Sequence, residues 1–264
     1  MSDSLLTDTA RRLAAVGVDN PRLDARLLWA HARGDGVVFE SFVSRREARE
    51  PLAYITGRKE FWSLEFEVGP GVLIPRPETE TIIETALAAF PDRTVPLNVL
   101  DFGTGTACLL VAFLKEFINS RGLGIEKSEK ARGYAIRNIA KHDLGSRCAI
   151  CAGDWADAAD GPYDVVLSNP PYIRASDIAG LQSEVSRFEP RQALDGGADG
   201  LSAYRALAPE IARRLCPKGR FFVEIGTGQS DEVADILGGA GLEIAKVVGD
   251  LAGIPRVLAG GLRW

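Results

Sequence analysis

Apolar side chains in the first 57 residues recur at the spacing of amphipathic helices. Over residues 4–17 this period is carried by Leu5, Leu6, Leu13 and Val16. Asn20 followed by Pro21 predicts the start of a second helix, with the asparagine as its N-cap. The expected apolar face of that helix is formed by Leu23, Leu27, Ala30 and His31. With a third helix predicted over residues 37–49, residues 1–57 are expected to form a small helical domain.

Residues 58–75 change character and predict a β-hairpin that links two domains. Residues 60–68 are rich in aromatic side chains and alternate in part, which is typical of a strand. A Gly-Pro-Gly sequence at 69–71 predicts a turn, and residues 72–74 predict a second, short strand.

Pro75, Arg76 and Pro77 follow the predicted hairpin and open a helix that we expect to continue to about Ala89. Two prolines around one arginine fix the direction of Arg76. Arg76 therefore either only begins the helix or contacts a cofactor or target nearby.

From residue 76 to residue 264, short apolar runs alternate with helical patterns, which predicts an α/β domain. Strands are expected at 98–102, 122–126, 147–152, 163–167, 220–225, 242–248 and 256–259. Helices are expected at 106–118, 128–141, 201–215 and 230–238. The segment from Ile173 to Gly200 has only weak periodicity, and a loop of this length is typical of a functional cover over a site.

Composition and charge narrow the class of protein. A chain of 264 residues suffices for one large domain and a small addition. It has no run of 18 apolar residues and no signal-peptide pattern, so we expect a soluble, cytoplasmic, monomeric protein that avoids membranes. The net charge is −5, with ten basic and eleven acidic residues up to Ile74. This balance disfavours a nucleic-acid substrate, because nucleic-acid binders usually carry a basic patch.

Cys148 and Cys151 have the spacing of a metal knuckle or a redox pair. They fall in a predicted strand, where side chains three positions apart face opposite sides. No second pair or nearby histidine completes a zinc site. We therefore predict structural cysteines and no bound metal, with structural roles for His31 and His142.

A glycine turn follows the predicted strand at 98–102 and precedes a helix. The turn consists of Gly103, Thr104, Gly105, Thr106 and Ala107. Glycines let a ligand approach the backbone, and a helix start offers free N–H groups. The dinucleotide pattern is incomplete, because Cys108 stands where a third glycine would be. The turn alone predicts a nucleotide-type ligand without identifying it.

Two further strand ends carry acidic residues. Glu126 ends the next strand and is placed to accept hydrogen bonds from both ribose hydroxyls of an adenosine. Asp154 and Trp155 follow the strand after that, where a carboxylate suits the adenine amine and an aromatic ring packs on its face. Each acid alone is equally typical of a surface loop. Together with the glycine turn, the three strand ends favour an adenosine-containing cofactor.

The sequence from Asn169 to Tyr172 makes a stiff turn at the end of the strand at 163–167, because Pro170 and Pro171 cannot continue a ladder. Asn169 offers an acceptor and two donors, and the Pro170 carbonyl is a second acceptor. Tyr172 adds a flat face with a polar tip. These groups suit a planar target with an NH2 group, such as a nucleobase amine or a glutamine amide. The alternative is a Pro-Pro loop with a capping asparagine.

Several motifs make the chain similar to the class I S-adenosylmethionine-dependent methyltransferases, and more narrowly to the HemK-type release factor glutamine methyltransferases. The resemblance covers almost the whole chain and rests on residues 49–57, 71–80, 101–106, 168–173 and 187–190. The turn at 168–173 is shared by several amine methyltransferases. The stretch at 74–80 is much more specific to this family.

This resemblance implies a Rossmann-like sheet of seven mostly parallel strands with helices on both faces, in a methyltransferase domain at 76–264. It also implies methyl transfer from S-adenosylmethionine to the N5 amide nitrogen of the glutamine in the Gly-Gly-Gln motif of peptide release factors. The helical domain at 1–57 would help to hold that protein substrate.

By position, the resemblance assigns two sets of residues to the site. The cofactor would be held by Gly103, Thr104, Gly105, Thr106, Ala107, Glu126 and Trp155, and the target glutamine by Asn169, Pro170, Pro171 and Tyr172. From the residues themselves we add Asp154 and Asn169 to the predicted cofactor site and Arg76 to the predicted substrate site, and we predict Asn169, Pro170 and Tyr172 as the catalytic residues.

Three features depart from the family pattern. Ala107 stands where glycine is usual, Glu126 replaces an aspartate, and the stretch between Arg33 and Ser41 is shorter. No histidine or cysteine stands in the motifs of the target site, so we expect positioning rather than general-base catalysis.

Two other functions remain open at the level of the sequence. The first is methylation of adenine N6 or guanine N2 in a nucleic acid, which the acidic balance disfavours. The second is a non-catalytic cofactor-binding module, which the intact Asn169 and its two prolines disfavour.

Overall fold

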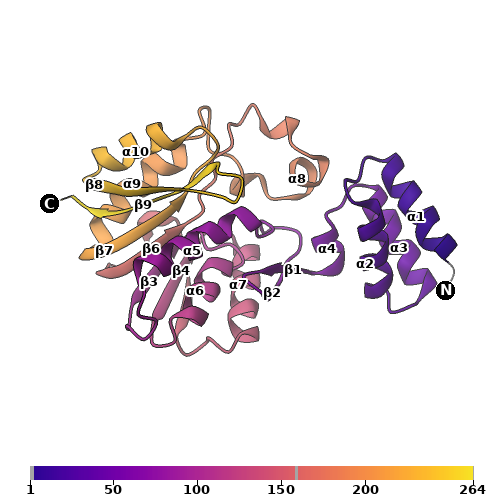
Figure 1. Ribbon diagram of the computed structural model, residues 1–264, viewed down its shortest axis with the longest axis horizontal. Helices are drawn as coiled ribbons and strands as arrows, with labels where there is room; N and C mark the ends of the chain where they lie inside the picture. The colour runs from indigo at the N-terminus through magenta and orange to yellow at the C-terminus, as the bar shows by residue number, and fades with distance from the viewer. Residues whose placement is uncertain (1–2, 158–159, 264) are drawn as a thin grey trace.

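The computed structural model describes residues 3–157 and 160–263 (Figure 1). The chain begins with the helices α1 (Asp3–Ala15), α2 (Pro21–His31), α3 (Gly36–Glu47) and α4 (Leu52–Thr56). Their buried side chains form a core separate from that of the sheet: Ala10, Leu13, Val18, Ala25, Leu28, Ala32, Phe39, Val43 and Ile55. In Figure 1 this helical group lies to one side of the sheet.

The predicted apolar face of α2 is wrong. Leu23 and Leu27 are 49% and 42% exposed, whereas Asp24 and Leu28 face the core. Asp24 is buried because it accepts a hydrogen bond from Arg46 Nε at 2.8 Å, in an ion pair between α2 and α3. A pattern of apolar positions does not reveal a face whose buried members include a paired acid.

Caps on these helices also differ in part from the prediction. Asn20 precedes α2, with Pro21 at the first helical position, but its side chain makes no cap hydrogen bond. Asp35 instead caps α3, since its carboxylate accepts from the backbone N–H of Val37 and Val38 at 2.9 and 3.0 Å. Such a cap is worth about 1 kcal/mol.

A hairpin of β1 (Arg58–Phe61) and β2 (Leu64–Glu67) joins the helices to the sheet. The hairpin predicted over residues 58–75 exists, but the predicted turn and second strand are wrong. The turn is formed by Trp62 and Ser63, both with positive φ (54° and 57°). Two-residue hairpin turns of this kind usually contain Asn or Gly. Because neither is present, the sequence of residues 60–68 predicts one continuous strand.

The sheet has seven strands in the order β5-β4-β3-β6-β7-β9-β8. The strands are β3 (Asn98–Phe102), β4 (Arg121–Glu126), β5 (Cys148–Ala152), β6 (Tyr163–Ser168), β7 (Leu215–Glu224), β8 (Leu242–Gly249) and β9 (Pro255–Leu262). Strand β9 pairs antiparallel with β7 and β8, whereas the other strand pairs described in the sheet are parallel. This arrangement confirms the predicted seven-stranded, mostly parallel sheet. It contains every strand predicted after residue 97. The strand predicted at 220–225 begins earlier, at Leu215, where the predicted helix was expected to end, and the last strand is also longer than expected.

Helices cover both faces of the sheet. The longer ones are α5 (Glu80–Ala89), α6 (Cys108–Glu116), α7 (Glu129–Lys141), α9 (Ser202–Arg214) and α10 (Ser230–Gly239), with the short turn η1 (Pro77–Thr79) before α5 and η2 (Trp155–Asp157) after β5. Among the described residues, no helix has the length and apolar character to cross a membrane.

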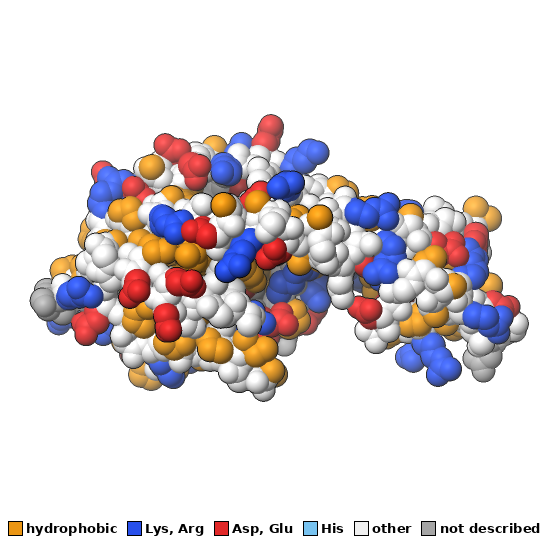
Figure 2. All heavy atoms as spheres, turned by 90° about the horizontal axis from the view of Figure 1, so that it is seen from above, with side chains coloured by type: hydrophobic (Ala, Val, Ile, Leu, Met, Phe, Trp, Pro, Cys, Tyr) orange, Lys and Arg blue, Asp and Glu red, His pale blue; other side chains and the backbone are white. Residues whose placement is uncertain are grey.

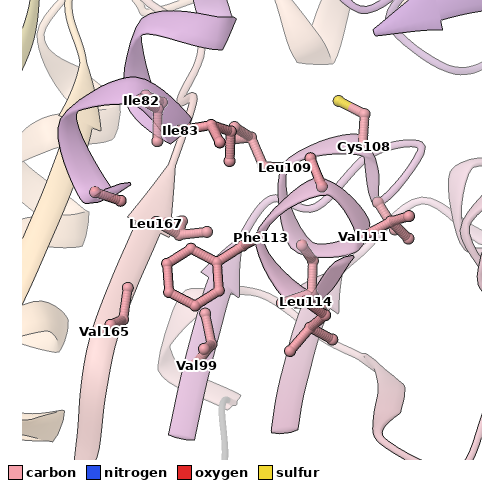
Figure 3. Packing of buried hydrophobic residues seen from close by; sticks show 14 of the residues in the cluster. Ile82, Ile83, Val99, Cys108, Leu109, Val111, Phe113, Leu114, Val165 and Leu167 are labelled. Carbon is pink, nitrogen blue, oxygen red and sulfur yellow. The ribbon is translucent and has the colours of Figure 1, made fainter. Parts of the chain in front are cut away.

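Successive residues of the central strands face two different cores, as expected for a sheet that is buried on both sides. Val99 and Val165 pack with α5 and α6, whereas Leu100 and Val166 pack with α9 and α10. Figure 3 shows Phe113 of α6 lying over β3 and β6. The apolar strands thus anchor the loops that follow them.

The long segment 173–200 contains short helices, η3 (Ile178–Gly180), α8 (Ser183–Phe188) and η4 (Arg191–Ala193). Figure 1 shows it extending from the sheet toward α4. Glu184 of α8 pairs with Arg46 and Arg49 at 2.8 and 2.5 Å. The segment therefore connects the helical group to the carboxyl edge of the sheet.

Candidate active site

A cavity of about 550 Å³ lies at the carboxyl ends of β3, β4 and β6. Strand β3 pairs with β4 on one side and with β6 on the other, so the chain changes direction across the sheet here. Open α/β sheets bind their ligands at such a switch point. The volume is that of a small-molecule site.

Most of the predicted site residues line this one cavity. They are Arg76, Gly103, Thr104, Gly105, Thr106, Glu126, Asp154, Trp155, Asn169, Pro170 and Pro171. Ala107 and Tyr172 do not line it. The cavity also has walls from residues after the hairpin, namely Gly71, Val72, Leu73 and Pro75, and from the segment 173–200.

The glycine turn after β3 presents its backbone to the cavity. Gly103 and Gly105 have positive φ values of 72° and 56°, which glycine adopts without steric cost. The N–H groups of Gly103 and Thr104 donate to the Ile125 carbonyl at 2.9 and 3.0 Å, which fixes the turn against β4. Helix α6 begins at Cys108, later than the predicted start at Thr106.

Ala107 was predicted among the cofactor-binding residues, and the structure corrects this. Its side chain is fully buried in the core with α6, and its φ is +63°. The left-handed backbone turns the methyl group into the core, which a sequence pattern does not reveal. Ala107 therefore shapes the turn without forming a wall of the cavity.

Asp101 lines the cavity, although the sequence did not single it out. One carboxylate oxygen accepts from the Thr104 hydroxyl at 2.5 Å, while Oδ1 is buried without a hydrogen-bond partner among the described residues. Burial raises the pKa of Asp101 to about 7, against the hydrogen bond from Thr104, which lowers it. An acid inside an apolar strand, just before a glycine turn, is the signal that could have identified it.

Glu126 is the last residue of β4 and lines the cavity. Its two oxygens accept from the backbone N–H groups of Gly105 at 3.0 Å and Ser128 at 2.8 Å. Each carboxylate oxygen can accept a further hydrogen bond. Glu126 therefore orients the glycine turn and still has acceptor capacity for a diol.

Asp154 and Trp155 lie at the third strand end. The Asp154 side chain is exposed, accepts from its neighbour's backbone N–H at 2.9 Å, and lies 3.5 Å from Lys127 Nζ. Trp155 is partly buried against the sheet, with its indole nitrogen close to Gly103. The ring thus forms a wall beside the glycine turn.

Asn169 lines the cavity and is partly buried. Its side-chain Nδ2 donates to Thr79 Oγ1 at 3.0 Å. The amide NH2 group is thereby directed at η1, and the carbonyl Oδ1 is left as an acceptor. Pro170 and Pro171 continue the same wall of the cavity.

Tyr172 was predicted to offer its ring to the target, and the structure does not support this. Its ring packs against the core on the α9 face, and its hydroxyl donates to Glu224 Oε1 at 3.1 Å. Burial and the nearby Glu224 raise the pKa of Tyr172 above its usual range. Tyr172 therefore anchors the turn from behind.

Arg76 immediately precedes η1, as predicted for a helix entry, and it also lines the cavity. Its guanidinium pairs with Glu189 at 2.5 Å. The other oxygen of Glu189 accepts from the Ile74 N–H at 3.2 Å. Burial raises the pKa of Glu189, although Arg76 lowers it. The pair connects the segment 173–200 to the residues just before α5.

The donor set fits an adenosine cofactor that carries a positive charge. Asp101 Oδ1 is a buried acceptor without a partner, the glycine turn leaves its backbone accessible, and Glu126 has spare acceptor capacity. Among the described residues, no cluster of His, Cys, Asp and Glu could hold a metal ion. The two cysteines of the predicted strand are divided, with Cys148 buried and Cys151 exposed.

Two solved structures that are similar to this fold are methyltransferases. A methyltransferase from Pyrococcus furiosus matches with a TM-score of 0.56 at 17% sequence identity, over 85% of this chain and 98% of its own. The 16S rRNA N2 G1207 methyltransferase from Thermus thermophilus, solved with AdoMet and guanosine, matches with a TM-score of 0.55 at 17% identity, over 78% of this chain and 50% of its own. At these identities the matches show the fold alone.

Sequence relatives are closer. A family model described as a methyltransferase domain matches residues 94–235. The release factor glutamine methyltransferase of Rhodospirillum rubrum is 42% identical over 271 residues, which cover 96% of this chain and 83% of that protein. The corresponding protein of Caulobacter vibrioides is 42% identical over 267 residues, covering 94% and 92%. The matches to these two proteins extend over the helical group as well as the sheet, and the chain belongs to the family of release factor glutamine methyltransferases.

Proposed function

We propose that this chain transfers a methyl group from S-adenosylmethionine to the N5 amide nitrogen of the glutamine in the Gly-Gly-Gln motif of peptide release factors. The observation that carries the proposal is the orientation of Asn169. Because its Nδ2 donates to Thr79, its Oδ1 is an acceptor at the cavity, as the NH2 group of a glutamine requires.

The cofactor half of the cavity supports the same proposal. When bound, S-adenosylmethionine supplies an activated methyl group on a sulfonium. Glu126 would accept from the ribose hydroxyls, Trp155 would pack against the adenine, and the free oxygen of Asp101 suits the cofactor's ammonium group. The turn at Gly103 and Gly105 lets the cofactor approach the backbone closely.

The residues of the target half contribute positioning. An amide nitrogen is a weak nucleophile, since its lone pair is delocalised into the carbonyl. Asn169 Oδ1 and the Pro170 carbonyl would hold its two hydrogens and direct the nitrogen at the methyl group. Orientation of this kind contributes up to roughly 7–11 kcal/mol to lowering a barrier. The same acceptors stabilise the positive charge that develops on nitrogen, and the proton leaves to solvent afterwards.

The surface charge favours a protein over a nucleic acid as substrate. The net charge is −5, and on the face in Figure 2 basic and acidic side chains are interspersed over both parts of the molecule. A nucleic-acid binder would gather basic residues along one face. Residues 1–57 would contact the release factor away from its glutamine, where a protein offers more surface for recognition than one side chain.

Transfer of labelled methyl from S-adenosylmethionine tests the proposed function. The acceptors are a purified release factor, the same factor with its Gly-Gly-Gln glutamine replaced by glutamate, total RNA and duplex DNA. We expect label in the first acceptor alone. Label in RNA or DNA, with none in the release factor, would reassign the substrate, and no transfer to any acceptor would refute the enzymatic role.

A further inference from the structure

Glu224, the last residue of β7, is a buried carboxyl group that does not line the cavity. It is 1% exposed. Its Oε1 accepts from the Tyr172 hydroxyl at 3.1 Å, and its Oε2 has no hydrogen-bond partner of ordinary geometry among the described residues. A buried carboxyl is costly unless it is hydrogen-bonded. Because this buried carboxyl lies beside the turn at residues 169–172, we expect it to serve a function there.

Thr79 lies between this carboxyl and Asn169. It is 2% exposed, and its Oγ1 accepts from Asn169 Nδ2 at 3.0 Å. A hydroxyl has one hydrogen to donate, and this bond does not use it. Thr79 lies near Glu224, because hydrogen bonding from its side chain is one influence that lowers the pKa of that carboxyl. No hydrogen bond of ordinary geometry joins the two groups among the described residues, so Glu224 Oε2 is left as an acceptor toward which the Thr79 hydroxyl can turn.

We propose that Glu224 is a positioning residue that holds both ends of the Asn169–Tyr172 turn and, through Thr79, keeps Asn169 Oδ1 directed at the target. This inference rests on the proposed function. A carboxylate only accepts hydrogen bonds, so Thr79 donates to it and must accept from the other side. That side is the NH2 group of Asn169, which leaves the amide oxygen for the cavity. Tyr172 attaches the far end of the turn to the same carboxylate.

Whether Asn169 Oδ1 stays directed at the target depends on the charge of Glu224. Burial raises the pKa of Glu224 to about 7, against the hydrogen bonds from Thr79 and Tyr172. The other titratable groups that act with this carboxyl electrostatically are Glu78 before α5, Cys108 of α6, Tyr204 of α9 and Arg256 of β9. Arg256 is itself paired with Asp250 at 2.9 Å.

Protonation of Glu224 reverses the direction of the hydrogen bonds that run from Asn169 through Thr79 to Glu224, which we call the relay. The Glu224 hydroxyl then donates to Thr79, whose own hydrogen becomes free to donate to Asn169. The Asn169 amide can then turn and present its NH2 group to the NH2 group of the target. Turnover should therefore fall as the pH drops through about 7, because Glu224 takes up a proton.

Steady-state kinetics of Glu224→Gln across pH 5.5–9 test the inference, with release factor as substrate and saturating cofactor. We expect kcat to fall about 10–100-fold at pH 8, as for loss of a partner that orients a reacting side chain, with the cofactor Kd and the KM for release factor within about twofold. The acidic limb near pH 7 should disappear. A variant with the wild-type kcat and the same limb would overturn the proposal.

A pair of Thr79 variants separates relay from packing. Thr79→Ser keeps the hydroxyl and should keep the wild-type kcat and acidic limb, whereas Thr79→Val keeps the shape and should behave as Glu224→Gln does. Equal activity of the two variants would contradict the relay. Tyr172→Phe removes a donor that lowers the pKa of Glu224, so it should move the limb to higher pH; an unmoved limb would assign the titration elsewhere.

A readout without methyl transfer keeps this inference distinct from the proposed function. The side-chain amide resonances of Asn169 in the cofactor-bound enzyme should titrate near pH 7 in the wild type and stay constant in Glu224→Gln. Titration that persists in the variant would overturn the relay whatever the substrate is. Failure of the wild type to methylate release factor would refute the proposed function alone.

Discussion

The two halves of the cavity are built in different ways. The half that would hold the cofactor is formed by the ends of β3 and β4, and its parts hold one another: Glu126 accepts from Gly105, and Gly103 donates to Ile125. The half that would hold the glutamine depends on distant parts of the chain. Asn169 is oriented by Thr79, 90 positions earlier in the chain, and the turn is anchored to Glu224.

Because of this difference, we expect substitutions in one half to change cofactor affinity and substitutions in the other half to change kcat. Changes in the cofactor half should appear mainly in cofactor binding, because its backbone turn and carboxylates are proposed to contact the cofactor alone. Changes in the target half should appear mainly in kcat, because we propose that this half orients the attacking nitrogen. The predictions below test whether the two halves behave as independent units.

Asn169→Ala should have the largest effect. Removal of one preorganised group that stabilises developing charge typically lowers kcat by about 10²–10³-fold. The cofactor Kd, measured by calorimetry, should change by less than about threefold. A variant that retains near-normal kcat would show that Asn169 only caps the turn. A large loss of cofactor affinity would show that the two halves of the cavity are not independent.

Glu126→Ala should have the opposite effects, with a large change in the cofactor Kd and a small change in kcat. Loss of hydrogen bonds to a charged acceptor costs about 1–3 kcal/mol, so the cofactor Kd should rise by roughly 5- to 150-fold. The kcat at saturating cofactor should stay within about threefold of the wild type. An unchanged Kd would remove Glu126 from the cofactor site.

The cofactor-free protein should lose stability as the pH rises through neutrality. Burial raises the pKa values of Asp101 and Glu224 to about 7, so each group is neutral in the folded state at lower pH. A raised carboxyl pKa contributes stability below its unfolded value near 4, and this contribution is lost as the pH rises through about 7. Each group should remove about 1 kcal/mol from the free energy of unfolding between pH 6 and pH 7. Denaturant titrations should show a smaller loss in Asp101→Asn, and an identical loss would show that Asp101 is ionised throughout.

Glu184→Gln should have the smallest effect, and only on the intact protein substrate. Glu184 is the carboxylate through which α8 pairs with Arg46 and Arg49 of the helical group. We expect kcat/KM for release factor to fall by about three- to tenfold, in line with about 1 kcal/mol for a hydrogen-bonded ion pair, with the cofactor Kd unchanged.

Glu40→Gln is the matched control for Glu184→Gln, because it removes the carboxylate of an exposed pair with Arg12 within the helical group. Exposed pairs contribute little, so kcat/KM should stay within about twofold. Equal losses in the two variants would mean that the contact of α8 with the helical group does not matter specifically.

Much of the fold and of the cofactor half could be predicted from sequence because the signals are local. A buried strand, a glycine turn and a helix stand together around Gly103, and the acid at Glu126 ends the next strand. The Trp62-Ser63 turn was missed because neither residue is typical of positive φ. Ala107 was misassigned because its side-chain direction follows from its left-handed backbone.

The target half was predicted only in part, because its geometry arises from contacts across the fold. The Asn-Pro-Pro-Tyr turn was recognisable, but nothing adjacent to it indicates that Tyr172 faces Glu224 or that Thr79 orients Asn169. Asp101 and Glu224 are acids at the ends of apolar strands. Their burial, which gives them chemical interest, becomes visible only when the helices pack over the sheet.

A structure of the enzyme with release factor and the demethylated cofactor would test the central arrangement most directly. We predict that the glutamine amide nitrogen lies within about 3.2 Å of both Asn169 Oδ1 and the Pro170 carbonyl, with Asn169 Nδ2 still donating to Thr79. A glutamine bound outside the cavity, or one that meets the NH2 group of Asn169, would contradict it.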